Sequence, residues 1–373
     1  MKIAQISPLI ESVPPRLYGG TERVVAYLTD ELVRQGHDVT LFASGDSRTC
    51  AKLVSASRQA LRLDPDVRDH LPYDLMMMQQ VKRLAPSFDV LHFHTDLAHF
   101  PVFSGTGNAT LTTLHGRQDL FELRDFYTSF PDMPLVSISA AQRMPIRRAN
   151  FAGTVLHGLP ANLLQPTLRP SGNYLAFVGR ISPEKGVDRA IEISRAVGMP
   201  LRIAAKVDRA DEIFFRERIA PLLSTPGVQY IGEINEREKA RFLGEAAALL
   251  FPIDWPEPFG LVMIEAMACA TPVVAFERGS VREVIDHGVT GWLVGSTEDA
   301  IRAVKPAIQL DRKTVRHRFE QRFTARRMAD DYVRLYQAII ATRSNAIPMS
   351  RPLPFAERRN SVSYCPQPDD RSG

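Results

Sequence analysis

Short apolar runs alternate with amphipathic segments along most of the chain. The run at residues 2–7 leads into a segment that starts near Thr21 and repeats apolar residues at Val24, Leu28 and Leu32. This spacing predicts a helix. Short apolar runs separated by helices are typical of parallel strands covered on both faces. In the first half, further strands are predicted at 37–44, 89–95, 109–115, 135–140 and 153–158.

The pattern restarts after a segment rich in proline, serine and glycine at residues 168–173. Two such sets predict an α/β protein made of two Rossmann-like domains that face each other across a cleft. We expect the first domain at residues 1–167 and the second at 168–325. The strands predicted for the second set are 174–179, 201–206, 228–233, 248–252, 272–276 and 291–295.

The last periodic segment, residues 326–343, predicts an amphipathic helix that packs back across the domains. Residues 344–373 contain five prolines and no periodicity, so a disordered tail is expected there. The apolar side of the predicted helix is formed by Tyr332, Leu335, Tyr336, Ile339 and Ile340.

The composition narrows the class of protein. With 373 residues, 45% hydrophobic and 24% charged, the chain is typical of a globular protein of two domains. It has no apolar run of the ~20 residues needed for a membrane span, and its start predicts a first strand, not a signal peptide. Cys50, Cys269 and Cys365 show no paired spacing, which favours a reducing cytoplasm. The net charge of +4 permits anionic ligands without requiring them.

One candidate site follows the first strand of the second set. The segment FVGRISPEKG, residues 177–186, places Gly179, Arg180 and Lys185 where a strand leads into a helix. Free backbone N–H groups and two cations at a helix start suit a phosphate. An ordinary solvated loop is the alternative.

A second candidate is EPFGLVMIE, residues 257–265, with a glutamate at each end. The spacing of the two carboxylates argues against a glycosidase pair and favours two separate contacts with one long ligand. Pro258 is expected in the first turn of a helix, and Gly260 would let a ligand approach the backbone. Glu257 as a helix-dipole partner and Glu265 as a solvated residue are the alternative, but apolar neighbours around Glu265 imply that its charge needs a partner.

Two weaker signals lie in the first half. Gly19 and Gly20 occur where the first strand's loop turns into a helix, either as a phosphate-side turn or as a structural turn. The pattern is not GxGxxG, so a dinucleotide is not supported. His115 ends a predicted strand and would lie at the ligand-facing edge of a parallel sheet, although a structural histidine is the alternative.

Two segments of the first half resemble metal sites. His92, His94 and Asp96 fit a binuclear metal run, but Leu97 replaces a required histidine. The acidic pair in residues 63–67 could hold a cation or form a turn.

Two basic segments are explained without nucleic acid. Residues 311–327 predict a solvated helix face with Phe319 and Phe323 as core anchors. The arginines of residues 143–148 suit either a membrane surface or solvent.

Together these motifs resemble glycosyltransferase family 4, whose members are retaining enzymes of the GT-B fold. The resemblance extends over about residues 1–342 and is carried by residues 18–25, 113–116, 177–186 and, most specifically, 257–294. It implies a GT-B α/β fold of two Rossmann-like domains.

The resemblance also implies roles for the site residues. Glu257 would contact the transferred sugar, Glu265 the ribose of the nucleotide, and His115 the sugar side of the cleft. The catalytic set implied is Glu257, His115, Arg180 and Lys185. The donor-binding set implied is Gly19, Gly20, Arg180, Lys185, Glu257, Phe259, Gly260, Leu261 and Glu265.

The expected function is transfer of a hexose from a UDP- or GDP-linked sugar to a hydroxyl of a saccharide, lipid or small-molecule acceptor, with retention of configuration. No metal, obligatory cofactor or nucleic acid is expected, and membrane association is at most peripheral, in the cytoplasm or at the inner face of the membrane. A GT-B sugar-nucleotide epimerase or hydrolase, or a non-catalytic nucleotide-sugar-binding protein, is the alternative.

The chain departs from the family pattern at 157–166, where the interdomain contact is expected to differ, and at 204–210. In the second segment, Lys206 either takes over an anion contact or belongs to a remodelled loop.

Overall fold

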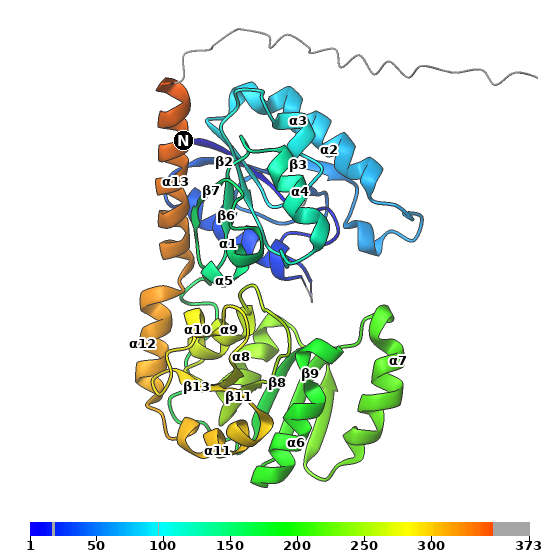
Figure 1. Ribbon diagram of the computed structural model, residues 1–373, viewed down its shortest axis with the longest axis vertical. Helices are drawn as coiled ribbons and strands as arrows, with labels where there is room; N and C mark the ends of the chain where they lie inside the picture. Colours follow the sequence, from blue (N-terminus) through cyan, green and yellow to red (C-terminus); the bar gives the residue numbers. More distant parts are fainter. Residues whose placement is uncertain (17–18, 96, 346–373) are drawn as a thin grey trace, which may run out of the picture.

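The computed structural model describes residues 1–16, 19–95 and 97–345. It contains two α/β domains, each built on one parallel sheet, which confirms the predicted fold class (Figure 1). The exact domain limits stay a prediction. Outside the described residues lie Tyr18, Asp96 and residues 346–373, which make up most of the predicted disordered tail.

The N-terminal sheet has the strand order β3-β2-β1-β4-β5-β6-β7, and every neighbouring pair is parallel. Its strands are β1 (Lys2–Ile6), β2 (Asp38–Ser44), β3 (Lys52–Ser57), β4 (Val90–Phe93), β5 (Thr110–Thr113), β6 (Leu135–Ser137) and β7 (Phe151–Thr154). Its helices are α1 (Gly20–Arg34), α2 (Leu71–Leu84), α3 (Phe100–Phe103), α4 (Phe121–Ser129) and α5 (Ala140–Arg143). Strand β3 was not predicted, and β7 begins two residues before the predicted segment 153–158.

The C-terminal sheet has the order β10-β9-β8-β11-β12-β13 and is also parallel. Its strands are β8 (Leu175–Arg180), β9 (Leu201–Lys206), β10 (Val228–Gly232), β11 (Ala248–Phe251), β12 (Val273–Phe276) and β13 (Gly291–Val294). Its helices are α6 (Val187–Val197), α7 (Glu212–Phe214), α8 (Glu236–Gly244), α9 (Leu261–Ala268), α10 (Val281–Val284), α11 (Thr297–Ala307) and α12 (Arg312–Arg322). All six strands correspond to predicted apolar runs.

The last helix, α13 (Ala325–Asn345), returns to the N-terminal domain and lies along it (Figure 1). Tyr332 and Tyr336 are fully buried, and Gln35 at the end of α1 donates to Asp330 at 2.8 Å. The helix therefore completes the core of the first domain. It runs two residues beyond the predicted end at 343, into the segment expected to be disordered. No helix among the described residues is both long and apolar enough to span a bilayer.

The basic segment around α12 contacts the segment of the chain that connects the two domains. Phe319 and Phe323 are fully buried, as predicted. The Arg312 guanidinium is not simply solvated, because it donates to the backbone carbonyl oxygens of Thr167 at 2.8 Å and Gly244 at 3.0 Å. Arg312 therefore stabilises the segment that connects the two domains.

Candidate active site

A cavity of about 770 Å³ lies between the domains, at the carboxyl ends of β1, β5, β8, β9 and β11. Parallel α/β sheets bind ligands at this edge. Every predicted site residue lines the cavity, so the structure brings together segments that are far apart in the chain. These are Gly19, Gly20, His115, Arg180, Lys185, Glu257, Phe259, Gly260, Leu261 and Glu265.

Glu257 is held in place by two donors to one oxygen. Its Oε2 accepts from Lys185 Nζ at 2.6 Å and from Trp255 Nε1 at 2.8 Å, and the residue is only 8% exposed. The Lys185 ammonium also lies 4.8 Å from the centre of the Trp255 ring, a cation–π distance. Because charge-assisted bonds fix the carboxylate, it is oriented before any ligand arrives. Trp255 was missed at the sequence level, although it lies two residues before Glu257.

The amino end of α9 lines the cavity beside Glu257. Gly260 has φ +79°, and a Cβ there would lie 2.7 Å from Met263 Cε, so glycine is required. This residue caps the helix, which starts at Leu261. The prediction that Pro258 occupies the first turn is therefore wrong, because Pro258 lies in the preceding loop. In the first turn the Met263 N–H donates to the carbonyl oxygen of Gly260 at 3.0 Å, and N–H groups at a helix start in general favour an anion.

Gly19 and Gly20, at the start of α1, line the cavity from the N-terminal domain. Gly19 has φ +152°, and a Cβ would lie 2.8 Å from Pro15 Cβ. A Cβ on Gly20 would lie 3.6 Å from Leu261 Cδ1, so the starts of α1 and α9 approach each other across the cleft. Gly19 therefore satisfies the positive φ and the close contact with Pro15, and it also lets the start of α1 approach the start of α9.

Arg180 ends β8 among carboxylates. Its guanidinium lies 2.5 Å from Glu184 Oε1, 3.3 Å from Asp211 Oδ2 and 3.7 Å from Asp208 Oδ2. Lys206 lines the cavity and pairs with Asp208 at 2.9 Å. The segment 204–210 thus brings both a cation and acids beside Arg180, and whether Lys206 takes over an anion contact stays a prediction. An anionic ligand at Arg180 would compete with these carboxylates.

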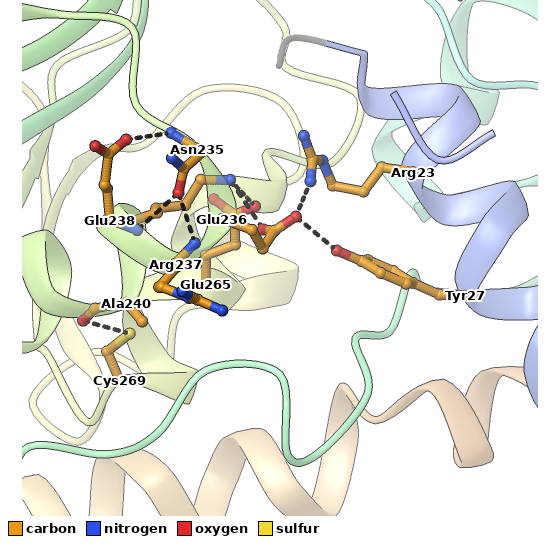
Figure 2. A network of polar contacts seen from close by, with 10 residues as sticks. Arg23, Tyr27, Asn235, Glu236, Arg237, Glu238, Ala240, Glu265 and Cys269 are labelled. Atoms are coloured by element: carbon orange, nitrogen blue, oxygen red, sulfur yellow. Dashed lines mark hydrogen bonds and ion pairs between the residues drawn. The ribbon is translucent and has the colours of Figure 1, made fainter. Parts of the chain in front are cut away.

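Glu265 belongs to an ionic network that crosses between the domains (Figure 2). The buried Glu265 carboxylate accepts from Lys239 Nζ at 2.7 Å, and the same ammonium lies 3.4 Å from Glu236. On the other domain, Arg23 forms an ion pair with Glu236, and Tyr27 Oη donates to it at 3.2 Å. The expected partner for the Glu265 charge is therefore Lys239, and Glu236 ties α8 to α1.

We expect Glu236→Gln to lower the free energy of unfolding by roughly 1–2 kcal/mol, because Arg23 and Lys239 lose a shared counter-charge in a partly buried position. Urea unfolding at neutral pH measures this difference. Glu217→Gln, an exposed change in the same domain, is the control and should change little. Equal stability of the two variants would show that the network does not hold the domains together.

His115 lines the cavity and is partly exposed. Burial lowers its pKa to about 3, so the ring is neutral near pH 7. It stacks on the buried His157 with ring centres 5.3 Å apart, and His157 packs edge-on against Phe259 at 4.9 Å. The sequence marked His157 only as a departure from the family pattern, yet it is part of the cavity wall.

The binuclear metal hypothesis does not fit the geometry. Both ring nitrogens of His92 are in hydrogen-bond contact with Tyr336 and Thr113, at 2.6 and 2.7 Å. Both nitrogens of His94 are engaged as well, at 2.8 and 2.7 Å. Within the described ranges no group of three or more potential ligands surrounds a metal position. Asp96, the third member of the run, lies outside those ranges.

The acidic pair in residues 63–67 forms a turn. The Asp66 amide donates to Asp64 Oδ1 at 3.2 Å, and neither residue lines the cavity.

Two facing parallel α/β domains with a cavity between their sheet ends are the architecture of the GT-B fold. The family model described as Glycosyltransferase Family 4 matches residues 18–155, and that described as Glycosyl transferases group 1 matches residues 164–325. The chain belongs to the glycosyltransferases of family 4 type.

Relatives with known names are similar over most of their length. A phosphatidyl-myo-inositol mannosyltransferase of Propionibacterium freudenreichii is 26% identical over 338 residues, covering 82% of this chain and 85% of the relative. The N-acetyl-alpha-D-glucosaminyl L-malate synthase of Bacillus anthracis is 23% identical, covering 88% and 96%.

Solved structures share the fold. Sucrose-phosphate synthase from Thermosynechococcus elongatus has a TM-score of 0.76 at 18% identity, covering 91% of this chain and 99% of that one. Anabaena HepE in complex with UDP and glucose has a TM-score of 0.69 at 18% identity, covering 91% and 100%.

Proposed function

We propose that this glycosyltransferase moves a hexose from a nucleoside-diphosphate sugar to a hydroxyl acceptor, with retention of anomeric configuration and without a catalytic metal ion. The observation that carries the proposal is the Lys185–Glu257 pair beside the start of α9, in the same cavity as Arg180. Two cations beside an oriented carboxylate support a donor whose diphosphate contacts the cations and whose sugar contacts Glu257.

The charges of these groups match the charges that develop in the reaction. Breaking a bond between a sugar and a diphosphate builds negative charge on the leaving phosphate and positive charge on the anomeric carbon. Arg180, Lys185 and the N–H groups of α9 oppose the first, and Glu257 opposes the second. Because the cations are fixed side chains, the chain can supply the positive charge that a metal would otherwise bring.

The donor proposal is supported by a structural neighbour, since HepE has been solved with UDP and glucose. The acceptor class follows the relatives, which include a phosphatidyl-myo-inositol mannosyltransferase and an O-antigen chain mannosyltransferase. We therefore propose a saccharide, lipid or small-molecule acceptor, and peripheral contact with the inner face of the membrane where that acceptor is a lipid. Release of a free or epimerised sugar, without a transferred glycoside, would favour the hydrolase or epimerase instead.

Calorimetric titration of UDP, GDP and ADP tests the donor site. One nucleotide is expected to bind more tightly than the others, and it identifies the base. Donor sugars with that base are then offered to candidate acceptors with and without a chelator, and the product anomer is assigned by NMR. An inverted anomer would overturn retention, and activity lost to the chelator would overturn metal independence. Failure of all three nucleotides to bind would remove the support for the donor site.

A further inference from the structure

A chain of hydrogen-bonded side chains runs from the cavity through the N-terminal domain to α13. His115 Nε2 lies 2.8 Å from His94 Nδ1, and His94 Nε2 lies 2.7 Å from Gln5 Oε1. Gln5 Nε2 donates to Tyr336 Oη at 3.0 Å, and this hydroxyl lies 2.6 Å from His92 Nδ1. Apart from His115, every member is buried.

The contacts define where the protons lie. Gln5 Oε1 can only accept, so His94 Nε2 donates to it. A neutral His94 then has a bare Nδ1, to which His115 Nε2 must donate. This leaves Nδ1 of His115 without a proton.

The remaining nitrogen of His115 is available to a ligand. Among the described residues, no group hydrogen-bonds to Nδ1 of His115, and the atom is not one of the buried unsatisfied atoms. The residue lines the cavity and is partly exposed. A neutral imidazole nitrogen in this position accepts a hydrogen bond from a hydroxyl and has no proton to donate.

We propose that Gln5 and His94 are positioning residues that hold His115 in the neutral Nε2–H tautomer, so that its Nδ1 accepts a hydrogen bond from a hydroxyl of the transferred sugar. The inference rests on the proposed function and deepens it. In this arrangement His115 recognises the sugar and does not act as a proton donor to the leaving phosphate. Tyr336, which is 331 positions from Gln5 in the sequence, hydrogen-bonds to Gln5, so α13 supports the orientation of the Gln5 amide.

The test uses Gln5→Glu, a change of nearly equal size. A carboxylate at this position accepts from both neighbours and favours a protonated His94, which then donates from both nitrogens. His115 Nε2 would have to accept, and its proton would move to Nδ1. The side-chain ¹⁵N signals of the ligand-free full chain, with His115 assigned by comparison with His115→Asn, report the tautomer directly.

We expect a bare Nδ1 on His115 in the wild type and a protonated Nδ1 in Gln5→Glu. With the donor identified by titration, the variant should raise the KM for the nucleotide sugar at least tenfold and leave the affinity for the nucleoside diphosphate unchanged. His99→Gln is the matched control. His99 is fully buried in the same domain and pairs with Thr112 at 2.8 Å. Among the described residues, no hydrogen bond or ring contact joins it to Gln5, His94 or His115, so both readouts should stay as in the wild type.

Two results would overturn the proposal. One is a wild-type His115 with its proton on Nδ1. The other is a Gln5→Glu variant that loses sugar and diphosphate affinity equally. The wild-type spectrum decides the tautomer even if the variant does not fold. A wild type that binds no nucleotide would defeat the proposed function, and it would do so independently of the tautomer.

Discussion

Replacing Lys185 by alanine is expected to weaken binding of the nucleoside diphosphate at least tenfold, about 1.4 kcal/mol. The same change should lower kcat/KM by about 30- to 1000-fold, corresponding to about 2–4 kcal/mol of transition-state stabilisation. The reason is that Lys185 both supplies positive charge to the diphosphate side of the cavity and holds Glu257 at 2.6 Å. Calorimetry and initial rates measure the two effects separately.

Lys313→Ala is the control for this experiment. It removes the same charge from an exposed position on α12, outside the cavity, so nucleotide affinity and rate should match the wild type. If Lys185→Ala bound the nucleotide as tightly as Lys313→Ala does, the cavity around Lys185 would not be the diphosphate site.

The second large effect is a loss of stability in mild acid. Burial lowers the pKa of His99 and of His115 to about 3, and it lowers the pKa values of His92, His94 and His157 in the same direction. In the unfolded chain each would titrate near 6.5. The unfolded state therefore binds more protons below that pH, and the stabilisation is present above about 6.5 and lost as the pH falls toward 3.

The expected size follows from the same linkage. For His99 and His115, whose pKa in the folded protein is about 3, the contribution to the free energy of unfolding falls by about 2 kcal/mol each between pH 7 and pH 5. His92, His94 and His157 change it in the same direction. The free energy of unfolding should therefore be several kcal/mol lower at pH 5 than at pH 7, measured by urea unfolding at each pH. His99→Gln should reduce this dependence, whereas His317→Gln, at an exposed position, should not. A free energy of unfolding that stays constant from pH 7 to pH 5 would show that these rings are protonated in the folded protein.

The sequence predicted most of the architecture because buried parallel strands produce apolar runs. Strand β3 was missed for the same reason, since Lys52–Ser57 is a partly exposed strand at the edge of the sheet and lacks such a run. The start of α9 was misplaced because a proline suggested a first turn, while the positive φ of Gly260 sets the boundary.

The sequence predicted part of the candidate site for a similar reason. Its residues lie in short motifs at strand ends, and the topology brings them to one cavity. No local pattern indicates the pairing of Arg180 with Asp208, because Asp208 belongs to no recognised motif. The hydrogen bonds of Gln5 to His94 and to Tyr336 join positions that are distant in the sequence, so no local pattern indicates them either. The sequence could have indicated Trp255 and His157 as site residues, since each lies in or beside a segment that the sequence analysis identified.

Helix α13 has a consequence for biosynthesis. The N-terminal domain closes its core with Tyr332 and Tyr336, which are synthesised after the whole C-terminal domain. Domains generally fold as units while the chain emerges from the ribosome. The N-terminal domain therefore cannot be completed first, so the C-terminal domain is free to fold before it, and the nascent N-terminal sheet leaves an apolar face open until α13 has been synthesised.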